Sequence, residues 1–376
     1  DPARRMALSW SGVRVQGLLG CRAAGGAALA LGAFVRACPR ARRALPAATR
    51  ALRRSLCTRA ASLNIWSFNL RTEFQDEADG PDGWTKRREG VADLIRARRP
   101  ALVCAQEATE PMLDFLASRL GDSGYAWAAT SRTPGVQDET AGFLFDQGCL
   151  DLQDRTVTWL APEGSQPGAL GWDAACPRTF EVADFVIRAD GLGERGCLRV
   201  LNTHLDHVGV EARRQSAEFL SAAIARGAAE RPACAQLLCG DFNSPKGSGG
   251  LTAEVYNILM SRSASTESDG QHLRDAAREA QVRKLVPSTI HKFEGTDFSA
   301  ARGDGTVELE AVGDQPSDAV QFPDARHIDW VMWRDGETGP RLKPLHFEVV
   351  TDRLASGRFP SDHFPLSVTF EVCCSL

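Results

Sequence analysis

Acidic residues are missing from the beginning of this chain. Residues 2–72 contain no aspartate or glutamate, and the first 61 residues have twelve arginines and no lysine beside the single acid Asp1. Arginine-rich, acid-poor segments with many small and apolar residues are typical of mitochondrial and chloroplast transit peptides. We therefore predict an organellar targeting segment over residues 1–61, without fixed structure and removed after import.

Long hydrophobic runs are also missing from this segment. Its most apolar stretch, residues 23–35, has thirteen residues, whereas a membrane-spanning helix needs about 20. We therefore predict no stable membrane span. Because arginines precede the apolar stretch, a secretory or membrane-anchored protein is the alternative to organellar import. The chain opens with Asp1 and its first methionine is Met6, so we expect the native start either upstream or at Met6.

Cysteine motifs are absent as well. The eleven cysteines include no CxxC pair and no Cys/His spacing that suits zinc, which argues against zinc-finger and thioredoxin-like proteins. Several cysteines, such as Cys104 and Cys239, lie in apolar, strand-like runs. We predict that they are reduced core residues, as in compartments that keep thiols reduced.

Beyond residue 61, acidic residues outnumber basic ones. Of the 44 Lys and Arg and the 48 Asp and Glu of the chain, 32 and 47 lie beyond residue 61, a net charge of −15. Broad, sequence-independent binding of duplex DNA needs a basic surface, so this charge argues against that class. An acidic body suits an enzyme that binds a cation, and a local basic groove remains compatible with it.

The folded part of the chain is marked by alternation of apolar and polar residues, which begins at Leu63. Strand-like runs recur from there onward, with a few segments at helical spacing between them. The predicted strands cover residues 63–69, 101–106, 142–145, 156–160, 180–187, 198–204, 236–242, 327–333, 345–350 and 364–372. The predicted helices cover residues 86–98, 111–120, 211–229, 251–262 and 272–284. Many strands with short links predict an α/β fold with two mainly antiparallel β-sheets packed face to face and helices outside.

The chain beyond residue 61 is predicted to form one domain, residues 62–376, because it has no internal repeat and no second hydrophobic core. Residues 296–326 are polar, rich in Gly and Asp, and without periodicity. A long loop of this kind is either disordered or forms the rim of an active site.

Carboxylates and amides lie at or just beyond the ends of several predicted strands. They are Asn69, Glu107, Asp241, Asn243 and Asp362. Neighbouring strands can bring such side chains to one rim of the sheets, where solvent reaches them. Hard divalent cations prefer oxygen ligands and neutralise the anionic transition state of phosphoester cleavage. We therefore predict a metal-dependent phosphoester-cleaving site with Glu107 as the best metal ligand, and Asn69 either assisting the metal or holding Glu107.

Two histidines complete this predicted site. His363 follows Asp362, and Asp329 is a candidate to orient it, because a carboxylate partner fixes the tautomer of an imidazole and raises its affinity for a proton. His363 can then act as a base or as a phosphate clamp. His204 ends another strand and would donate to a non-bridging phosphate oxygen, with a purely structural role as the alternative.

The motifs, in this order, resemble those of the endonuclease/exonuclease/phosphatase superfamily, which has the fold of deoxyribonuclease I. The resemblance extends from Leu63 to about Val372 and depends on Asn69, Gln106-Glu107, Asn202-Thr203-His204, Gly240-Asp241-Phe242-Asn243-Ser244-Pro245, His327-Ile328-Asp329 and Ser361-Asp362-His363-Phe364-Pro365. It implies a four-layer α/β sandwich that depends on Mg²⁺ or Mn²⁺. By position it implies Asn69, Glu107 and Asp362 at the metal, Asp241 and Asn243 on the nucleophile and phosphate, His204 on the phosphate, and Asp329 paired with His363.

Within the superfamily, residues 206–215 and 291–295 are similar to a bacterial-type hydrolase group close to the nocturnin and angel deadenylase branch. Relatives often have an arginine that supports the phosphate. The candidate for that arginine is Arg178, which precedes a predicted strand.

Three functions follow from these observations. The leading hypothesis is a Mg²⁺-dependent phosphodiesterase, a 3′-5′ exonuclease of the exoribonuclease or deadenylase type that acts on single-stranded RNA or nucleotide-like substrates. The alternative is a phosphatase of a small phosphorylated metabolite, which the acidic body favours. The third is a non-catalytic scaffold of the same fold, against which the complete set of carboxylates and histidines argues. The sequence does not indicate an oligomeric state.

Overall fold

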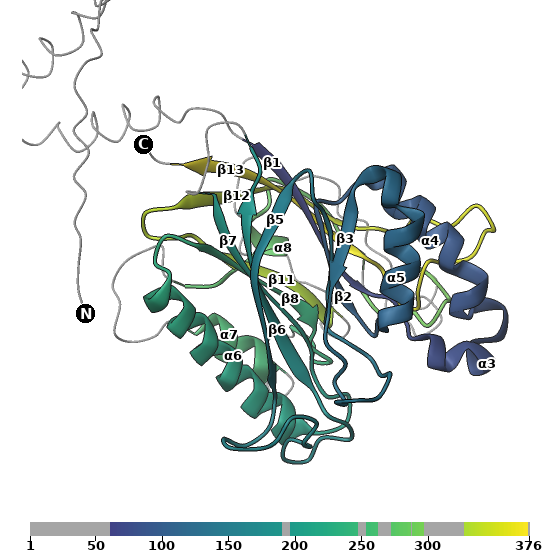
Figure 1. The fold of residues 1–376 in the computed structure, drawn as a ribbon, viewed down its shortest axis with the longest axis horizontal. Coiled ribbons are helices and arrows are strands. Elements are labelled where there is room, and N and C mark those ends of the chain that lie inside the picture. Colours follow the sequence, from purple (N-terminus) through teal and green to yellow (C-terminus); the bar gives the residue numbers. More distant parts are fainter. Residues whose placement is uncertain are drawn as a thin grey trace, which may run out of the picture. The chain divides into compact units, whose positions relative to one another are not determined.

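Two β-sheets packed face to face form the centre of the molecule in this computed structural model (Figure 1). The structure describes residues 61–189, 196–246, 253–261, 272–286, 288–296 and 327–374. These residues lie in one compact unit, Cys57–Leu376. The predicted targeting segment lies outside the described residues except for residue 61, as does the predicted loop 296–326 except for residue 296.

One sheet has seven strands and the other has six, and most neighbouring strands are antiparallel. The order in the first is β10 (Val282–Lys284), β12 (Pro340–Val349), β13 (Leu366–Cys374), β1 (Ala61–Asn69), β2 (Leu102–Gln106), β4 (Phe143–Asp146) and β3 (Tyr125–Ala128). The order in the second is β5 (Leu150–Trp159), β6 (Thr179–Ile187), β7 (Cys197–His204), β8 (Ala235–Asp241), β11 (Asp329–Arg334) and β9 (Arg274–Asp275).

The longer helices cover the outer faces of both sheets (Figure 1), whereas the single turn α8 (Ala276–Glu279) packs Ala276 and Ala277 into the core between the sheets. The helices are α3 (Asp76–Asp79), α4 (Trp84–Arg98), α5 (Glu110–Arg119), α6 (Val210–Glu230), α7 (Glu254–Met260) and α8 (Ala276–Glu279), with 3-10 turns at Glu73–Gln75, Gly80–Asp82 and Gly121–Ser123. On β1, Ile65 packs into the core between the sheets and Trp66 into the core under α4 and α5. On β8, Leu237 faces the other sheet and Leu238 packs in the core with α6 and α7. The predicted four-layer α/β sandwich is confirmed.

The predicted helix over residues 272–284 is wrong. This segment forms the short strand β9, the single turn α8 and the edge strand β10. The side chain of Asp275 caps α8 by accepting a hydrogen bond from the backbone N–H of Ala277, and it also accepts one from Lys246 Nζ at 2.8 Å. This buried contact holds the chain in the strand conformation before α8. Strand β3 was not predicted, because it is short and alanine, which is uncommon in strands, occupies two of its four positions.

The prediction that the cysteines are reduced is wrong for one pair. Cys197 and Cys234 form a disulfide that joins the start of β7 to the residue before β8. Cys104 and Cys239, in contrast, are free and buried between the two sheets. Within the described ranges, we find no helix with both the length and the apolar character to cross a membrane.

Parallel strand pairs in the two sheets determine where polar strand ends meet. In one sheet β1 runs parallel to β2, so that Asn69 and Gln106 end side by side. In the other, β7 runs parallel to β8, with His204 opposite Asp241. The antiparallel strand β11 begins with Asp329, which is also paired with Asp241. The carboxyl ends of four central strands and the start of a fifth therefore lie at a common edge of the sandwich.

Candidate active site

Asn69 links the two sheets at this edge by holding two carboxylates. Its Nδ2 donates to Glu107 Oε1 at 2.9 Å and to Asp241 Oδ2 at 3.0 Å, while its Oδ1 accepts from the backbone N–H of Arg71. The backbone N–H of Thr72 donates to the other oxygen of Glu107. In this arrangement Asn69 positions Glu107, the second of the two roles that the sequence leaves open.

A second amide pair joins the sheets behind the carboxylates. Gln106 Nε2 donates to Asn202 Oδ1 at 2.6 Å, and Asn202 Nδ2 donates to the carbonyls of Ala105 and Gly142. All of these groups are buried, and buried polar groups need such partners. Gln106 and Asn202 thus fix the distance between the strand ends that bear Glu107 and His204.

Gly240 permits the close approach of β7 and β8 beside the site. A Cβ atom at this position would lie 2.4 Å from the carbonyl oxygen of Thr203, closer than any side chain allows. The next residues alternate: Asp241 faces the site, while Phe242 points into the outer core and stacks on Trp330 with ring centroids 4.1 Å apart. The glycine and the aromatic residue of this motif are therefore structural.

Asn243 connects Asp241 with His204. Its backbone N–H donates to Asp241 Oδ1, and its Nδ2 donates to the carbonyl of Leu205 and lies 3.0 Å from His204 Nε2. Burial, and then the nearby charge of Arg178, lower the pKa of His204 well below its usual value. A neutral His204 can accept the hydrogen bond from Asn243, so it is not a cationic phosphate clamp in this state.

His363 has the opposite electrostatic environment. Its Nδ1 lies 3.0 Å from Asp329 Oδ2 and 3.8 Å from Asp241 Oδ2. Burial alone would lower the pKa of His363, but these carboxylates, Asp329 first, raise the pKa well above its usual value. An antiparallel bridge to Ile290 holds the backbone of His363, and the hydroxyl of Thr289 accepts from the N–H of Asp329. These two carboxylates therefore favour the protonated form of His363.

Asp362 lies on the other side of the site, next to Arg71. Their side chains approach to 3.8 Å, while Arg71 makes two closer hydrogen bonds to Asp79 at 2.9 and 3.0 Å. Burial raises the pKa of Asp362. The carbonyl of Asp362 accepts backbone hydrogen bonds from His291 and Lys292, so the segment that follows β10 is fixed against the site.

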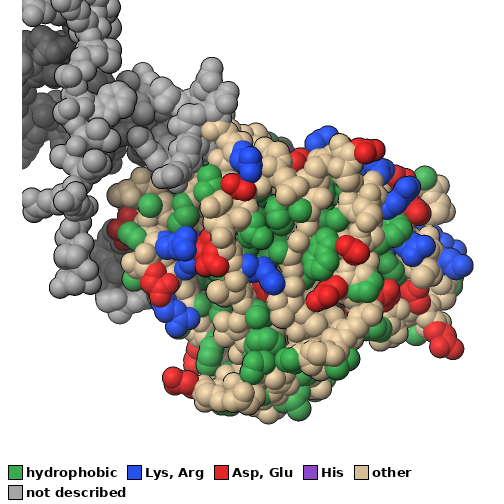
Figure 2. Space-filling view, viewed as in Figure 1, with side chains coloured by type: hydrophobic (Ala, Val, Ile, Leu, Met, Phe, Trp, Pro, Cys, Tyr) green, Lys and Arg blue, Asp and Glu red, His purple; other side chains and the backbone are tan. Residues whose placement is uncertain are grey.

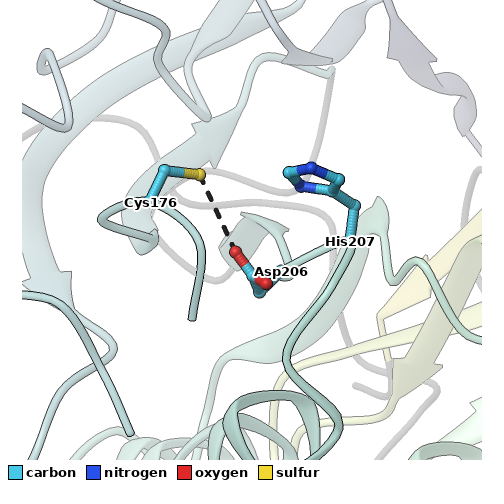
Figure 3. Close-up of side chains that lie close together, drawn as sticks. All are labelled: Cys176, Asp206 and His207. Carbon is cyan, nitrogen blue, oxygen red and sulfur yellow. Dashed lines mark hydrogen bonds between the residues drawn. The ribbon is translucent and has the colours of Figure 1, made fainter. Parts of the chain in front are cut away.

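Arg178 lines another wall of the site, beside a cluster formed by Cys176, Asp206 and His207. Figure 3 shows the three residues of this cluster. Asp206 accepts hydrogen bonds from three backbone N–H groups, from Arg178 Nε at 3.4 Å and from Cys176 Sγ at 3.7 Å. Arg178 Nη2 lies 3.0 Å from His207 Nδ1. Because a guanidinium already occupies these groups, the cluster suits the orientation of Arg178 better than the binding of a metal. Arg178 is 5 % exposed and lines the site, and its role as a phosphate ligand stays a prediction.

Asp206→Asn is expected to destabilise the protein in a pH-dependent manner. Burial opposes the charge of Asp206, but hydrogen bonds from backbone N–H groups and the charge of Arg178 lower its pKa from 3.8 to about 2. The charged form therefore stabilises the fold above pH 4, and this contribution is lost as the pH falls towards 2. Urea unfolding at several pH values should show a difference between wild type and variant that shrinks on acidification. An equal difference at pH 2.5 and pH 6 would contradict this assignment.

These walls enclose a pocket of about 700 Å³. Six of the eight predicted site residues line it, namely Glu107, His204, Asp241, Asn243, Asp362 and His363. Asn69 and Asp329 lie directly behind, hydrogen-bonded to Glu107 and His363. The lining also includes His207, Lys292 and Phe293, from the segments 206–215 and 291–295, and residues that the sequence did not indicate: Arg71, Thr72, Gln75, Asp79, Arg132 and Glu139. Most of these lie in irregular segments, which have no periodicity to reveal them.

Backbone strain is concentrated around the pocket. Arg71, Glu107 and Asn243 have φ values of 53°, 53° and 45°, in the left-handed region that non-glycine residues rarely adopt. Such conformations cost about 1–3 kcal/mol each and persist where surrounding contacts enforce them. Here the enforcing contacts are the hydrogen bonds that position Glu107 and Asn243 in the site.

The donor set of the pocket suits a hard divalent cation. Glu107, His204 and Asp241 each present a ligand atom, and these atoms lie within 4.8 Å of one another. Carboxylates predominate, and Asp362 adds a further one across the pocket. Burial, followed by the charge of Asp329, raises the pKa of Asp241 to about 7. A cation would offset this mutual repulsion, and oxygen ligands are those that Mg²⁺ and Mn²⁺ prefer.

The profile of the Endonuclease/Exonuclease/phosphatase family matches residues 61–363. The chain belongs to this family. It is therefore a metal-dependent phosphoric ester hydrolase, and the family that the sequence motifs resemble is confirmed. The similarity to the nocturnin and angel branch stays a prediction. No curated protein matches the sequence.

Several solved structures are similar to this fold. An endonuclease/exonuclease/phosphatase family protein from Bacteroides thetaiotaomicron is 24% identical with a TM-score of 0.61, covering 83% of this chain and 98% of that one. A mannosyl-6-phosphatase from the same organism is 22% identical with a TM-score of 0.61, covering 82% and 99%. D. rerio TDP2, complexed with a single-strand DNA product, is 17% identical with a TM-score of 0.51, covering 82% and 99%. At these identities the similarity concerns the fold alone.

Proposed function

We propose that the protein is a metal-dependent phosphatase that releases phosphate from a small, polar phosphorylated metabolite. The observation that supports this most directly is the composition of the pocket. Of the described residues that line it, Phe293 is the single phenylalanine, tyrosine or tryptophan, and most of the others are charged or polar. A volume of about 700 Å³ is in the usual range for a small-molecule site.

In this proposal, different residues of the pocket bind the cation, align the attacking water and donate a hydrogen bond to the phosphate. Glu107 and Asp362 would hold the cation together with Asp241, and the bound cation would supply Lewis-acid stabilisation of the phosphoryl oxygens. Asp241, oriented by the backbone N–H of Asn243, would align the attacking water. The protonated His363, held by Asp329, would donate to a phosphate oxygen.

Arg178 adds a second cation for the phosphate. Its planar guanidinium can bind two phosphate oxygens at once. Contacts with Asp206 and His207 hold this guanidinium at the pocket wall. Because the pKa of His204 is lowered, His204 would contribute to the site by its hydrogen bond with Asn243 rather than by a positive charge.

The surface of the protein offers further support. Proteins that bind single-stranded nucleic acids combine a basic groove with aromatic rings on which successive bases stack. Figure 2 shows acidic and basic side chains interspersed over the visible face, without a continuous basic area. The net charge of −15 beyond residue 61 also favours a small anion drawn into a local cationic site over a long polyanion.

A substrate panel tests the proposal. With Mg²⁺, the full chain is expected to release inorganic phosphate from small phosphomonoesters at least tenfold faster, per substrate molecule, than it releases nucleotides from 5′-labelled oligo(A). Phosphate is measured colorimetrically and nucleotides by denaturing gel. Rapid shortening of the oligonucleotide without phosphate release from any monoester would contradict the proposal.

The second candidate is a 3′-5′ exonuclease that acts on single-stranded RNA or a nucleotide-like substrate. One observation favours it: the pocket rim places the exposed Lys292 beside the half-buried ring of Phe293. Such a pair can stack one base and contact one phosphate. The oligonucleotide arm of the same experiment detects this activity, and the order in which labelled products appear gives its polarity. The presence of Glu107, Asp241, Asp362 and His363 in one pocket argues against the scaffold alternative.

A further inference from the structure

The chain between β3 and β4 forms one wall of the pocket, and we call residues 129–142 the β3–β4 wall. Hydrogen bonds fix both ends of it. The N–H of Thr130 donates to Glu181 Oε1 at 2.6 Å, and the N–H of Thr140 donates to the carbonyl of Ala108 at 2.7 Å. The N–H of Arg132 donates to the carbonyl of Glu139 at 2.9 Å and closes the loop between them. Side chains on this wall therefore have well-defined positions.

Two charged side chains of the wall face the pocket as a pair. Arg132 Nη1 donates to Glu139 Oε2 at 2.7 Å, and Arg132 Nε donates to Asp138 Oδ1 at 3.1 Å. The side chains of Arg132 and Glu139 are 17% and 15% exposed, and both line the pocket. Among the described residues, Arg132 Nη2 and Glu139 Oε1 have no hydrogen-bond partner. One donor and one acceptor therefore remain available to a ligand.

The stability of the wall does not account for Glu139. Asp138 already accepts from Arg132 and from Thr133 Oγ1, and the backbone closes the loop without the Glu139 side chain. Burial and the charge of Glu107 raise the pKa of Glu139 to about 7. The contacts that fix the wall therefore do not require the Glu139 carboxylate.

A donor beside an acceptor on a rigid, partly buried frame matches neighbouring hydroxyl groups, because each hydroxyl both donates and accepts. We propose that Arg132 and Glu139 bind adjacent hydroxyl groups of the leaving group, so that the substrate is a sugar or polyol phosphate. This inference rests on the proposed phosphatase function. A leaving group with a second phosphate would be repelled by Glu139 and Asp138, and a nucleobase would find no aromatic ring on this wall that lines the pocket.

The test compares two substrates of the full chain with Mg²⁺: a hexose phosphate, which has adjacent hydroxyls, and ethyl phosphate, which has none. Glu139→Gln is expected to lower kcat/KM for the hexose phosphate by about 10- to 100-fold, because the accepting carboxylate loses its charge and one of its two oxygens is replaced by a donating N–H2 group. Most of the change should be in KM. For ethyl phosphate, kcat/KM should stay within about twofold of wild type. Glu163→Gln, an exposed glutamate outside the pocket, is the matched control.

Arg132→Lys serves as the second variant, because it keeps the charge but loses the fork of donors. This variant should also lower the ratio of kcat/KM for the hexose phosphate to kcat/KM for ethyl phosphate. Thermal melting reports whether each variant is folded. An equal loss for both substrates in folded protein, or no loss for either, would overturn the inference and leave the phosphatase function standing. A wild-type protein that releases no phosphate from any monoester would overturn both.

Discussion

Asp241→Asn is expected to lower kcat/KM by about 10³-fold or more, because it removes a preorganised charge from the centre of the reaction. Asp241 accepts from Asn69 and Asn243, and its Oδ2 lies 3.6 Å from His204 and 3.8 Å from His363. Asparagine has the same shape but cannot supply the charge that binds the cation and aligns water. Steady-state phosphate release with saturating Mg²⁺ measures the loss.

The fold should survive this change. Burial and Asp329 raise the pKa of Asp241 to about 7. Above that pH Asp241 is ionised in the metal-free folded protein, and this ionised form lowers the free energy of unfolding. The melting temperature of metal-free Asp241→Asn at pH 8 should therefore stay close to that of wild type, because removal of the buried charge offsets the hydrogen bond that is lost where an N–H2 group replaces an accepting oxygen. Asp146→Asn, a buried strand-end acid outside the pocket, is the control and should keep its activity. Activity of Asp241→Asn within tenfold of wild type would refute the assigned role.

The fold was predictable because most strands are long enough to show alternation. The errors fall where this signal is weak. Strand β3 has four residues, and residues 272–284 have apolar residues that fit a helix equally well until the contact of Asp275 with Lys246 decides the conformation. The disulfide between Cys197 and Cys234 joins the starts of two parallel neighbours. No spacing in the sequence indicates such a pair, since the pairing of β7 with β8 is a property of the tertiary structure.

The residues of the candidate site also fall into a group that was predictable from the sequence and a group that was not. Residues at strand ends, such as Glu107 and Asp241, were predictable, because the sheet that orders them also leaves a pattern in the sequence. The pocket walls were not, because Arg132 and Glu139 lie in a loop whose conformation depends on contacts with Ala108 and Glu181. These walls determine which substrate fits. The sequence therefore indicated the reaction better than the substrate, and our proposal of a small phosphorylated metabolite in place of RNA depends on the composition of these walls.

The electrostatics of the site also could not be inferred from residue types. His204 and His363 are both strand-adjacent histidines near Asp241, yet the pKa of one is lowered and that of the other is raised. The difference arises from partners distant in sequence: Arg178 lies near the first and Asp329 near the second. One site thus contains a neutral imidazole and a cationic one, which divides acceptor and donor roles between them.

Glu107→Gln is expected to abolish the stabilisation of the folded protein by Mg²⁺. A cation that binds only the folded state stabilises it by about 2.7 kcal/mol at a concentration 100-fold above its Kd. Glu107 directly follows β2, accepts two hydrogen bonds and has a left-handed backbone conformation, and together these present its carboxylate to the pocket. In the Glu107→Gln variant, the neutral amide should weaken Mg²⁺ binding. The same Mg²⁺ concentration should then raise the free energy of unfolding by less than about 1 kcal/mol.

Thermal melting of chelator-treated protein with and without Mg²⁺ measures this difference independently of any substrate, so it tests the metal site even if the proposed substrate class is wrong. Glu110→Gln, an exposed glutamate three residues further along the chain and outside the pocket, should respond to Mg²⁺ as wild type does. Equal stabilisation of Glu107→Gln and wild type would show that the cation binds elsewhere. The strained backbone of Glu107, and the hydrogen bonds by which Asn69 holds Glu107 and Asp241 together, would then need another explanation.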